Sequence, residues 1–234
     1  MDSAPSWETR MIEVKSRDGW TTNVYSPLLS VRWGLFAKTP TLAIKKLSQL
    51  PSNTVQSILE HLYANTPVSR TNLPAFKACK IVESIPFVST YNDDMMTLLN
   101  DTTSSDFSIY CNDEVSNVPL HKFILYARCD FFKELFLNSP LMPRLVEKNF
   151  SISGLRMFSE YLYTGDIVNI DLISLVELFG AGKTYGLRDP EEIDFLAQTY
   201  LRQGINTDNA SEIKAKAHER GLSNLISMID SLNI

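Results

Sequence analysis

The stretch Leu120–Phe132, "LHKFILYARCDFF", has a counterpart earlier in the chain, Val24–Phe36, "VYSPLLSVRWGLF", and the two align without a gap. The aligned positions pair similar residues: Leu28 with Ile124, Leu29 with Leu125, Arg32 with Arg128 and Phe36 with Phe132. A short run precedes each copy, "MIEVKSRDG" at 11–19 and "DFSIYCNDE" at 106–114, and its alternation with a period of two is typical of a strand. These matches predict an internal repeat, in which a strand and a turn lead into each copy.

The repeat resumes about four residues further displaced, where Ile58–Asn65, "ILEHLYAN", aligns with Phe158–Gly165, "FSEYLYTG". A stretch with helical periodicity then follows in each copy, "LPAFKACKIVESI" in the first and "LISLVELFGAGKTYGL" in the second. We therefore predict an α+β fold with two similar units, residues 10–92 and 104–188, joined by a polar linker at residues 100–105.

The last segment, residues 189–234, has the pattern of an α-helical tail. Asp189 is the predicted N-cap of its first helix, with Pro190 at the first helical position and Gly204 at the end. The segment "ASEIKAKAHERGLSNLISMIDSL" predicts one or two further helices.

The composition argues against several classes of function. The chain has 234 residues and a formal net charge of −5, so we expect no electrostatic attraction to nucleic acid or to an anionic membrane. Three cysteines without a CxxC pair and three histidines give no zinc-site spacing. We therefore expect no metal, cofactor or small-molecule substrate. Because we find no signal-peptide pattern and no apolar run of about 18 residues, we expect a cytoplasmic or nuclear protein.

The segment Phe179–Thr184, "FGAGKT", raises the alternative of a nucleotide-binding enzyme. A phosphate-binding loop needs the pattern GxxxxGK[ST], and the position of its first glycine holds Glu177, whose charge is wrong for a phosphate cradle. Apolar residues with helical spacing surround the segment, so we predict a continuous helix here, with Gly180 and Gly182 allowing another element to approach closely.

The segment Ser105–Phe136, "SDFSIYCNDEVSNVPLHKFILYARCDFFKELF", resembles the signature of the BTB/POZ domain family. The resemblance continues through "FSISGLRMFSEYLYTGDIVNI", in which Tyr163-Thr164-Gly165 matches the family's Tyr-Thr-Gly. The tail resembles the three-box or BACK region that follows such domains in ubiquitin-ligase adaptors. The first unit resembles a degenerate copy, with Tyr25 in place of the family's His and Asn65 in place of its Gly.

The resemblance implies that the edge of the helix containing Phe132 and Phe136, and the loop that follows it, form a surface for a protein partner. Two alternatives stay open for this aromatic cluster, a role in the core and a role at the partner surface. The residues that we predict to bind a partner are Phe132, Phe136, Leu141, Met142, Glu147, Tyr161 and Tyr163.

The implied function is non-enzymatic: a substrate adaptor or scaffold, with cullin-3 as one expected partner and the protein itself or another BTB protein as others. Cullin-binding members carry a hydrophobic-x-Glu motif, and Pro143 stands here where the Glu is expected, which argues against cullin binding. One alternative is an oligomerisation scaffold without a ligase role. A further hypothesis is a monomeric pseudo-dimer, in which the first unit occupies the dimer surface of the second.

Overall fold

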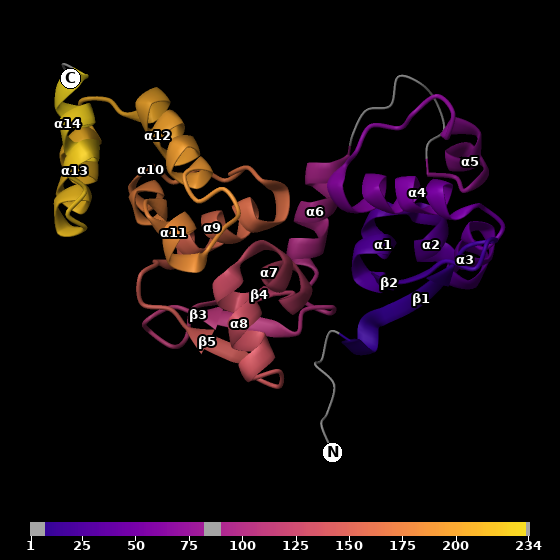
Figure 1. The fold of residues 1–234 in the computed structure, drawn as a ribbon. Helices are drawn as coiled ribbons and strands as arrows, with labels where there is room; N and C mark the ends of the chain where they lie inside the picture. The colour runs from indigo at the N-terminus through magenta and orange to yellow at the C-terminus, as the bar shows by residue number, and fades with distance from the viewer. Residues whose placement is uncertain (1–7, 82–89, 233–234) are drawn as a thin grey trace. The chain divides into compact units, whose positions relative to one another are not determined.

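A computed structural model describes residues 8–81 and 90–232, and residues 82–89 of the predicted first unit lie outside it. The chain separates into two compact units, Met1–Ser104 and Ser105–Ile234 (Figure 1). Both contain small sheets and many helices, so the α+β fold class is confirmed. None of the described helices is both long enough and apolar enough to cross a bilayer.

The first unit begins with the 3₁₀ helix Glu8–Arg10 and an antiparallel hairpin of β1 (Met11–Lys15) and β2 (Thr21–Tyr25). The helices that follow are α1 (Ser26–Arg32), α2 (Gly34–Lys38), α3 (Pro40–Leu47), α4 (Ser52–Ala64), α5 (Leu73–Ala78) and α6 (Tyr91–Asn100). Leu29, Trp33, Phe36, Ile58 and Phe76 are at most 2% exposed and form the core between hairpin and helices.

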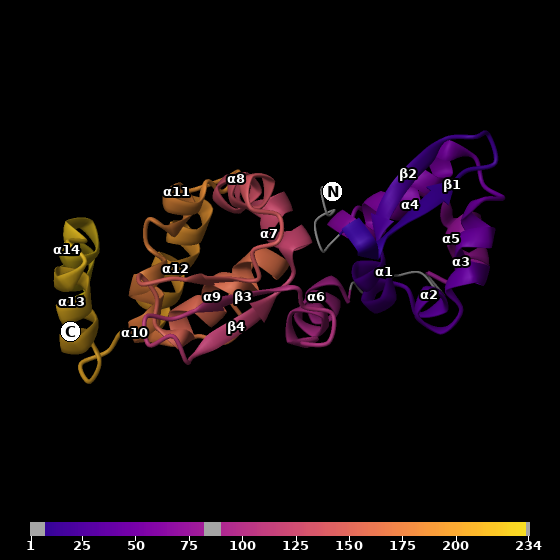
Figure 2. The ribbon, with the colours of Figure 1, turned by 90° about the horizontal axis from the view of Figure 1, so that it is seen from below.

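The second unit contains a three-stranded sheet of β3 (Phe107–Tyr110), β4 (Asn117–Leu120) and β5 (Arg144–Val146). Strand β3 lies in the centre, antiparallel to β4 and parallel to β5. The helices of this unit are α7 (Lys122–Arg128), α8 (Asp130–Asn138), α9 (Ile152–Thr164), α10 (Leu172–Leu175) with the 3₁₀ helix η2 (Val176–Leu178), α11 (Ala181–Tyr185), α12 (Glu192–Gly204), α13 (Ala210–Glu219) and α14 (Ser223–Ser231). Helices α13 and α14 lie side by side in both views (Figures 1 and 2).

The order of elements is the same in the two units. Elements β3, β4, α7 and α8 each begin 96 residues after β1, β2, α1 and α2, respectively. Helices α4 and α9 both have 13 residues and begin 100 residues apart. The additional displacement equals the extra length of α8, which has nine residues where α2 has five. Both long helices end at a residue in the left-handed conformation, Asn65 at φ 54° and Gly165 at φ 80°.

The two units differ in the segment between these helices. Residues 40–47 form helix α3, whereas the equivalent residues 140–147 form a loop and strand β5. Ala43 donates its N–H to the carbonyl of Thr39 (3.1 Å) as the first hydrogen bond of α3. Pro143 occupies the same place in the second unit and has no N–H to donate, so a helix cannot continue through it.

Two local predictions were wrong. The segment around "FGAGKT" is interrupted, because Phe179 is extended and Gly180 adopts φ 79° between η2 and α11. Helix α12 begins at Glu192, and its preceding residue makes no side-chain cap, so Asp189 is not the N-cap. The end of this helix at Gly204 is as predicted.

Candidate functional site

Four of the seven predicted partner-binding residues lie in the interior of the second unit: Phe132, Phe136, Tyr161 and Tyr163, each at most 2% exposed. Phe107 makes edge-to-face contacts with Phe132 (6.1 Å) and Phe136 (5.0 Å), which attaches α8 to the central strand. Phe132 and Phe136 therefore lie in the core, which is the first of the two alternatives for this aromatic cluster.

Tyr163 joins the long helix α9 to the end of β4. Its hydroxyl accepts the backbone N–H of His121 (2.9 Å), and it also lies 2.8 Å from the His121 Nδ1 atom. The first unit repeats the arrangement, because the Tyr63 hydroxyl accepts the backbone N–H of Tyr25 (2.6 Å). Burial raises the pKa of Tyr63 to about 12. This bond satisfies a backbone donor at the same place in both units.

Tyr161 points towards the tail. Its hydroxyl donates to a carboxylate oxygen of Glu192 at the start of α12 (2.7 Å). Burial, followed by this hydrogen bond, raises the pKa of Tyr161 above its usual range, so the hydroxyl stays protonated and remains a donor. Tyr161 is therefore a contact between α9 and α12.

The loop after α8 is held firmly at its base. The Lys122 ammonium, almost fully buried beside the Phe136 ring, donates to the carbonyl of Pro140 (2.8 Å). Desolvation lowers the pKa of Lys122. Pro143 accepts the N–H of Ser108 (3.0 Å) at the start of β3. The segment between these two anchors contains Leu141, which is 62% exposed.

Large apolar side chains are exposed on α8 and on this loop. Phe131 is 39%, Leu137 64% and Leu141 62% exposed, and we call these three residues the α8 surface. Met142 is half-buried beside Leu141. Phe131 also contacts the rings of Phe132 (5.1 Å) and Tyr185 (5.5 Å). Large exposed apolar side chains on a helix and on the loop that follows it are candidates for an interaction site.

Glu147 has internal partners. Its carboxylate accepts from the hydroxyl of Tyr185 and from the backbone N–H of Asn149 (2.9 Å). The Tyr185 ring stacks on Phe132 (5.8 Å) beneath α8. Sequence reasoning did not identify Tyr185 or Lys122, because the pattern of the chain does not reveal a contact between a loop and a distant helix.

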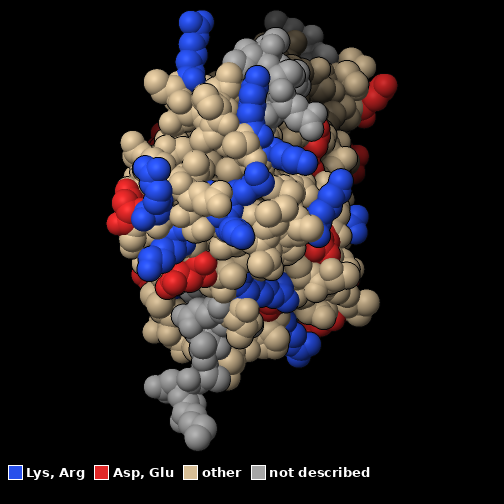
Figure 3. All heavy atoms as spheres, turned by 90° about the vertical axis from the view of Figure 1, so that its right-hand side faces the viewer, with Lys and Arg blue, Asp and Glu red and all other residues tan. Residues whose placement is uncertain are grey.

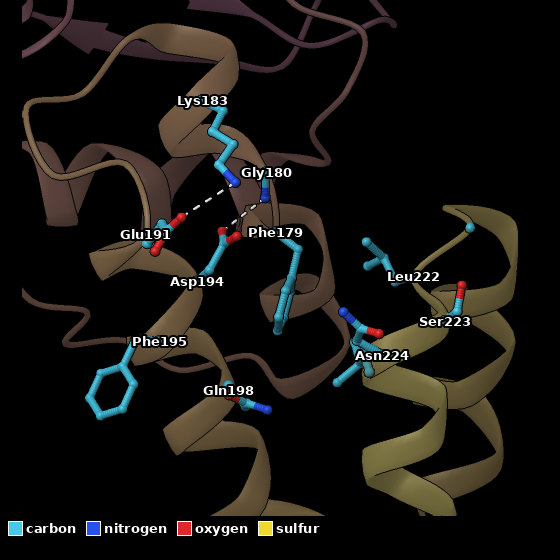
Figure 4. Close-up of a pocket in the computed structure, with 12 residues that line it drawn as sticks. Phe179, Gly180, Lys183, Glu191, Asp194, Phe195, Gln198, Leu222, Ser223 and Asn224 are labelled. Carbon is cyan, nitrogen blue, oxygen red and sulfur yellow. Dashed lines mark hydrogen bonds and ion pairs between the residues drawn. The ribbon is translucent and has the colours of Figure 1, made fainter.

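The "FGAGKT" segment lies beside a pocket of about 650 Å³ formed by α11, α12 and the start of α14 (Figure 4). The backbone N–H of Gly180 donates to the carboxylate of Asp194 (2.8 Å), and the ammonium of Lys183 pairs with Glu191 (3.5 Å). The two groups that would have to bind a phosphate, the Gly180 N–H and the Lys183 ammonium, therefore already bind carboxylates. Helix α11 has five residues, which provides little of the dipole that such a site uses.

We expect ATP and magnesium to leave the melting temperature of the protein unchanged, in the natural chain and in Lys183→Ala alike. A nucleotide present at about 100 times its dissociation constant would add about 2.7 kcal/mol to the free energy of unfolding. Differential scanning fluorimetry measures this directly. A shift in the natural chain that Lys183→Ala removes would restore the nucleotide-binding alternative.

The described residues contain no group of three or more His, Cys, Asp or Glu side chains placed to hold a metal. Cys79, Cys111 and Cys129 are buried thiols. Burial raises the pKa of all three, and that of Cys129 reaches about 12, so these thiols are poor nucleophiles at neutral pH.

Glu177 connects three parts of the second unit. Its carboxylate accepts the N–H (2.7 Å) and the hydroxyl (2.9 Å) of Ser151 at the start of α9, and it pairs with Lys216 of α13 (3.3 Å). Its side chain is 5% exposed. Glu177, whose charge argued against a phosphate-binding loop, is thus a buried residue that connects η2 to α9 and to α13.

We expect Glu177→Ala to lower the free energy of unfolding of the second unit by about 3 kcal/mol, because it removes a buried carboxylate that accepts two hydrogen bonds from Ser151 and pairs with Lys216. Urea denaturation followed by circular dichroism gives the value. Glu219→Ala is the control, because Glu219 is 70% exposed and also contacts Lys216 (3.9 Å). Equal losses in the two variants would mean that the buried hydrogen bonds contribute nothing measurable.

Comparison with known proteins agrees with the resemblance in the sequence. A family model described as BTB/POZ domain matches residues 95–193. The chain is 24% identical over 139 residues to a Drosophila melanogaster protein described as BTB/POZ domain-containing protein 9, covering 58% of this chain and 19% of that protein. It is 34% identical over 108 residues to the Mus musculus BTB/POZ domain-containing protein 7, covering 41% of this chain and 9% of that protein.

Among solved structures, the BTB domain of zebrafish PATZ1 matches with 23% identity and a TM-score of 0.37, covering 52% of this chain and all of that one. The BTB domain of human gigaxonin matches with 12% identity and a TM-score of 0.29, covering 64% of this chain and 98% of that one. The chain spans less than a fifth of the length of the two curated relatives.

Proposed function

We propose that the chain is a non-enzymatic adaptor or scaffold whose α8 surface receives a protein partner. The match of residues 95–193 to the BTB/POZ domain, a module of protein–protein interaction, supports this proposal. The exposure of Phe131, Leu137 and Leu141 is the observation that carries this proposal. Buried rings and the bond from Lys122 to Pro140 hold the loop in place. Binding of a partner therefore costs little entropy for ordering this loop.

The partner that we propose is the N-terminal domain of a cullin-3-type scaffold. The helical tail supports this assignment, because α12 and α13 pack on α10 within the same unit and extend the domain as the BACK region does in ligase adaptors. Pro143 replaces the expected Glu, and Glu147 is engaged with Tyr185, so recognition here depends on apolar contact. We place this activity in the cytoplasm or nucleus, in keeping with three unpaired buried thiols.

We also propose that the first unit is a degenerate BTB-like domain. The repeated element order, the equivalent tyrosine bonds at Tyr63 and Tyr163 and the left-handed caps at Asn65 and Gly165 support this. Helix α3 replaces the loop and β5 in this unit, so the segment that carries Leu141 has no extended counterpart there.

We expect Leu141→Asp to weaken binding of a cullin-3 N-terminal domain at least tenfold, because it places a charge in the apolar contact, at a cost of more than about 1.4 kcal/mol in binding free energy. Isothermal titration calorimetry measures the affinity. Val115→Asp is the matched control: Val115 is 78% exposed and lies in the turn between β3 and β4, which belongs neither to α8 nor to the loop after it.

The outcomes separate the alternatives. Loss of binding with Leu141→Asp but not with Val115→Asp supports a ligase adaptor. An absence of binding by the natural chain at micromolar concentration contradicts the cullin partner, and light scattering then tests the scaffold alternative. A dimeric mass that does not change on dilution indicates a homodimer, and a monomeric mass supports the pseudo-dimer.

A further inference from the structure

The charges of this chain are strongly segregated. Between Arg10 and Lys80 the sequence has ten Lys and Arg residues and three Asp and Glu residues, which gives a net charge of +7 for that segment. Residues 105–234 have 12 basic and 18 acidic residues, a net charge of −6. The first unit as a whole, residues 1–104, has ten basic and nine acidic residues and a net charge of +1, so its basic residues are concentrated between residues 10 and 80.

Most of these basic residues are exposed: Lys15, Arg17, Lys38, Lys45, Arg70, Lys77 and Lys80, with Lys46 half-buried. We call these eight residues the basic face. Within the described part of the chain, none of the eight has a carboxylate within ion-pair distance. Arg32, in contrast, is buried and paired with Asp94 (2.8 Å).

Only three carboxylates, those of Glu13, Asp18 and Glu60, stand against the ten basic residues of the segment. Asp18 accepts from Ser16 and, at 3.0 and 2.8 Å, from the backbone N–H and hydroxyl of Ser52. These bonds lower the pKa of Asp18 well below its usual range. Asp18 is therefore ionised and keeps its negative charge, and its acceptor sites are occupied by Ser16 and by Ser52 at the start of α4.

The basic residues lie on elements that contact one another. Helices α2 and α3 pack together, and the charge of Lys46 on α3 acts on Cys79 at the end of α5, next to Lys77 and Lys80. The N–H of Arg17 donates to the carbonyl of Leu50 (2.8 Å), which joins the β1–β2 turn to the segment after α3. Figure 3 shows the molecule from the side of α3 and α5, and there blue side chains are spread over the face with red ones among them.

We propose that the basic face binds an acidic protein segment, one rich in Asp and Glu. Single-stranded nucleic acid is disfavoured because none of the aromatic side chains among residues 10–81 is exposed: those of Tyr25, Trp33, Phe36 and Phe76 are buried, and those of Trp20 and Tyr63 are half-buried. An acidic segment complements the positive charge of the basic face.

This partner is distinct from the one proposed for the α8 surface, and the two are measured separately. A protein that holds a scaffold through one unit and an acidic segment through the other would bring two proteins together. Failure of either binding experiment leaves the other standing.

The test uses a fluorescein-labelled peptide of about 20 residues with Glu at alternate positions, and measures fluorescence anisotropy with the full chain at about 50 mM salt. We expect Lys45→Glu/Lys77→Glu to weaken binding about tenfold, and high salt to abolish it. Lys133→Glu/Lys148→Glu is the matched control, with the same change of net charge at two exposed lysines of the second unit. Thermal melts check that both double variants are folded.

Equal weakening by the two double variants would overturn the proposal, because net charge alone would then explain binding. An absence of peptide binding by the natural chain at low salt would overturn it as well. A duplex DNA of equal charge is the second ligand. If the DNA binds more tightly than the peptide and Lys45→Glu/Lys77→Glu reduces its binding more, the partner class is nucleic acid and the proposal is wrong.

Discussion

Replacing Gly182 with alanine is expected to lower the free energy of unfolding of the second unit by about 4 kcal/mol or more. A Cβ atom at this position would lie 1.9 Å from the carbonyl oxygen of Pro190 and 2.7 Å from its Cα atom. The obstacle is backbone, so no side-chain rotation relieves the overlap, and α11 must separate from the start of α12. Guanidinium denaturation monitored by circular dichroism gives the loss.

Two other glycines serve as controls for Gly182→Ala. Gly34→Ala meets nothing within 4 Å and has no left-handed backbone, so we expect a change below about 1 kcal/mol. Gly180→Ala also meets nothing, but its φ of 79° costs about 1–2 kcal/mol in a residue with a Cβ. If Gly182→Ala costs less than Gly180→Ala, the close approach to Pro190 does not limit stability.

The sequence predicted the parts of the fold that depend on local pattern. The ungapped alignment of Val24–Phe36 with Leu120–Phe132 corresponds to a constant spacing of 96 residues between equivalent elements. The renewed match at Ile58–Asn65 corresponds to α4 and α9 and to their left-handed ends. Strand and helix periods depend on which residues face the core, and both copies keep that pattern.

The same sequence failed at "FGAGKT", for a physical reason. Gly182 is present because a neighbour approaches closely, as predicted, but Gly180 is present because the chain turns there with positive φ. Apolar residues continue on both sides of that turn, because both short helices pack into one core. The hydrophobic periodicity therefore predicts a single helix and does not reveal the turn. The turn is held by the bond from Gly180 to Asp194, which is 14 residues away in the chain.

The candidate site shows the same division between local and distant information. Leu141 could be selected from its place in a proline-bounded loop, and the structure exposes it. The other aromatic candidates are buried, because aromatic side chains bury large apolar areas and contribute strongly to a core. They are Phe132, Phe136, Tyr161 and Tyr163. The Lys122 anchor to Pro140 depends on a contact between α7 and a loop 18 residues further on, which no spacing rule predicts.

Replacing Arg32 with methionine is expected to destabilise the first unit by about 3–5 kcal/mol. The Arg32 side chain is 2% exposed and donates to the carbonyls of Leu62 (3.0 Å) and His61 (3.2 Å) in the last turn of α4. It also pairs with Asp94 (2.8 Å) and lies 4.9 Å from the centre of the Tyr91 ring, both on α6. Methionine fills part of the volume but leaves two helix-end carbonyls and one carboxylate without this donor.

Arg128→Met is the matched control for Arg32→Met, because the repeat aligns the two arginines and Arg128 is exposed. We expect its effect to stay within about 0.5 kcal/mol. Since unfolding of a two-unit chain need not be two-state, hydrogen exchange resolved by peptide is the better measurement. In Arg32→Met the amides of α1, α4 and α6 should exchange faster while those of α7 and α9 stay protected. Faster exchange throughout both units would mean that Arg32 stabilises the whole chain, and equal effects of the two substitutions would mean that the buried bonds of Arg32 are not what holds α6 to the first unit.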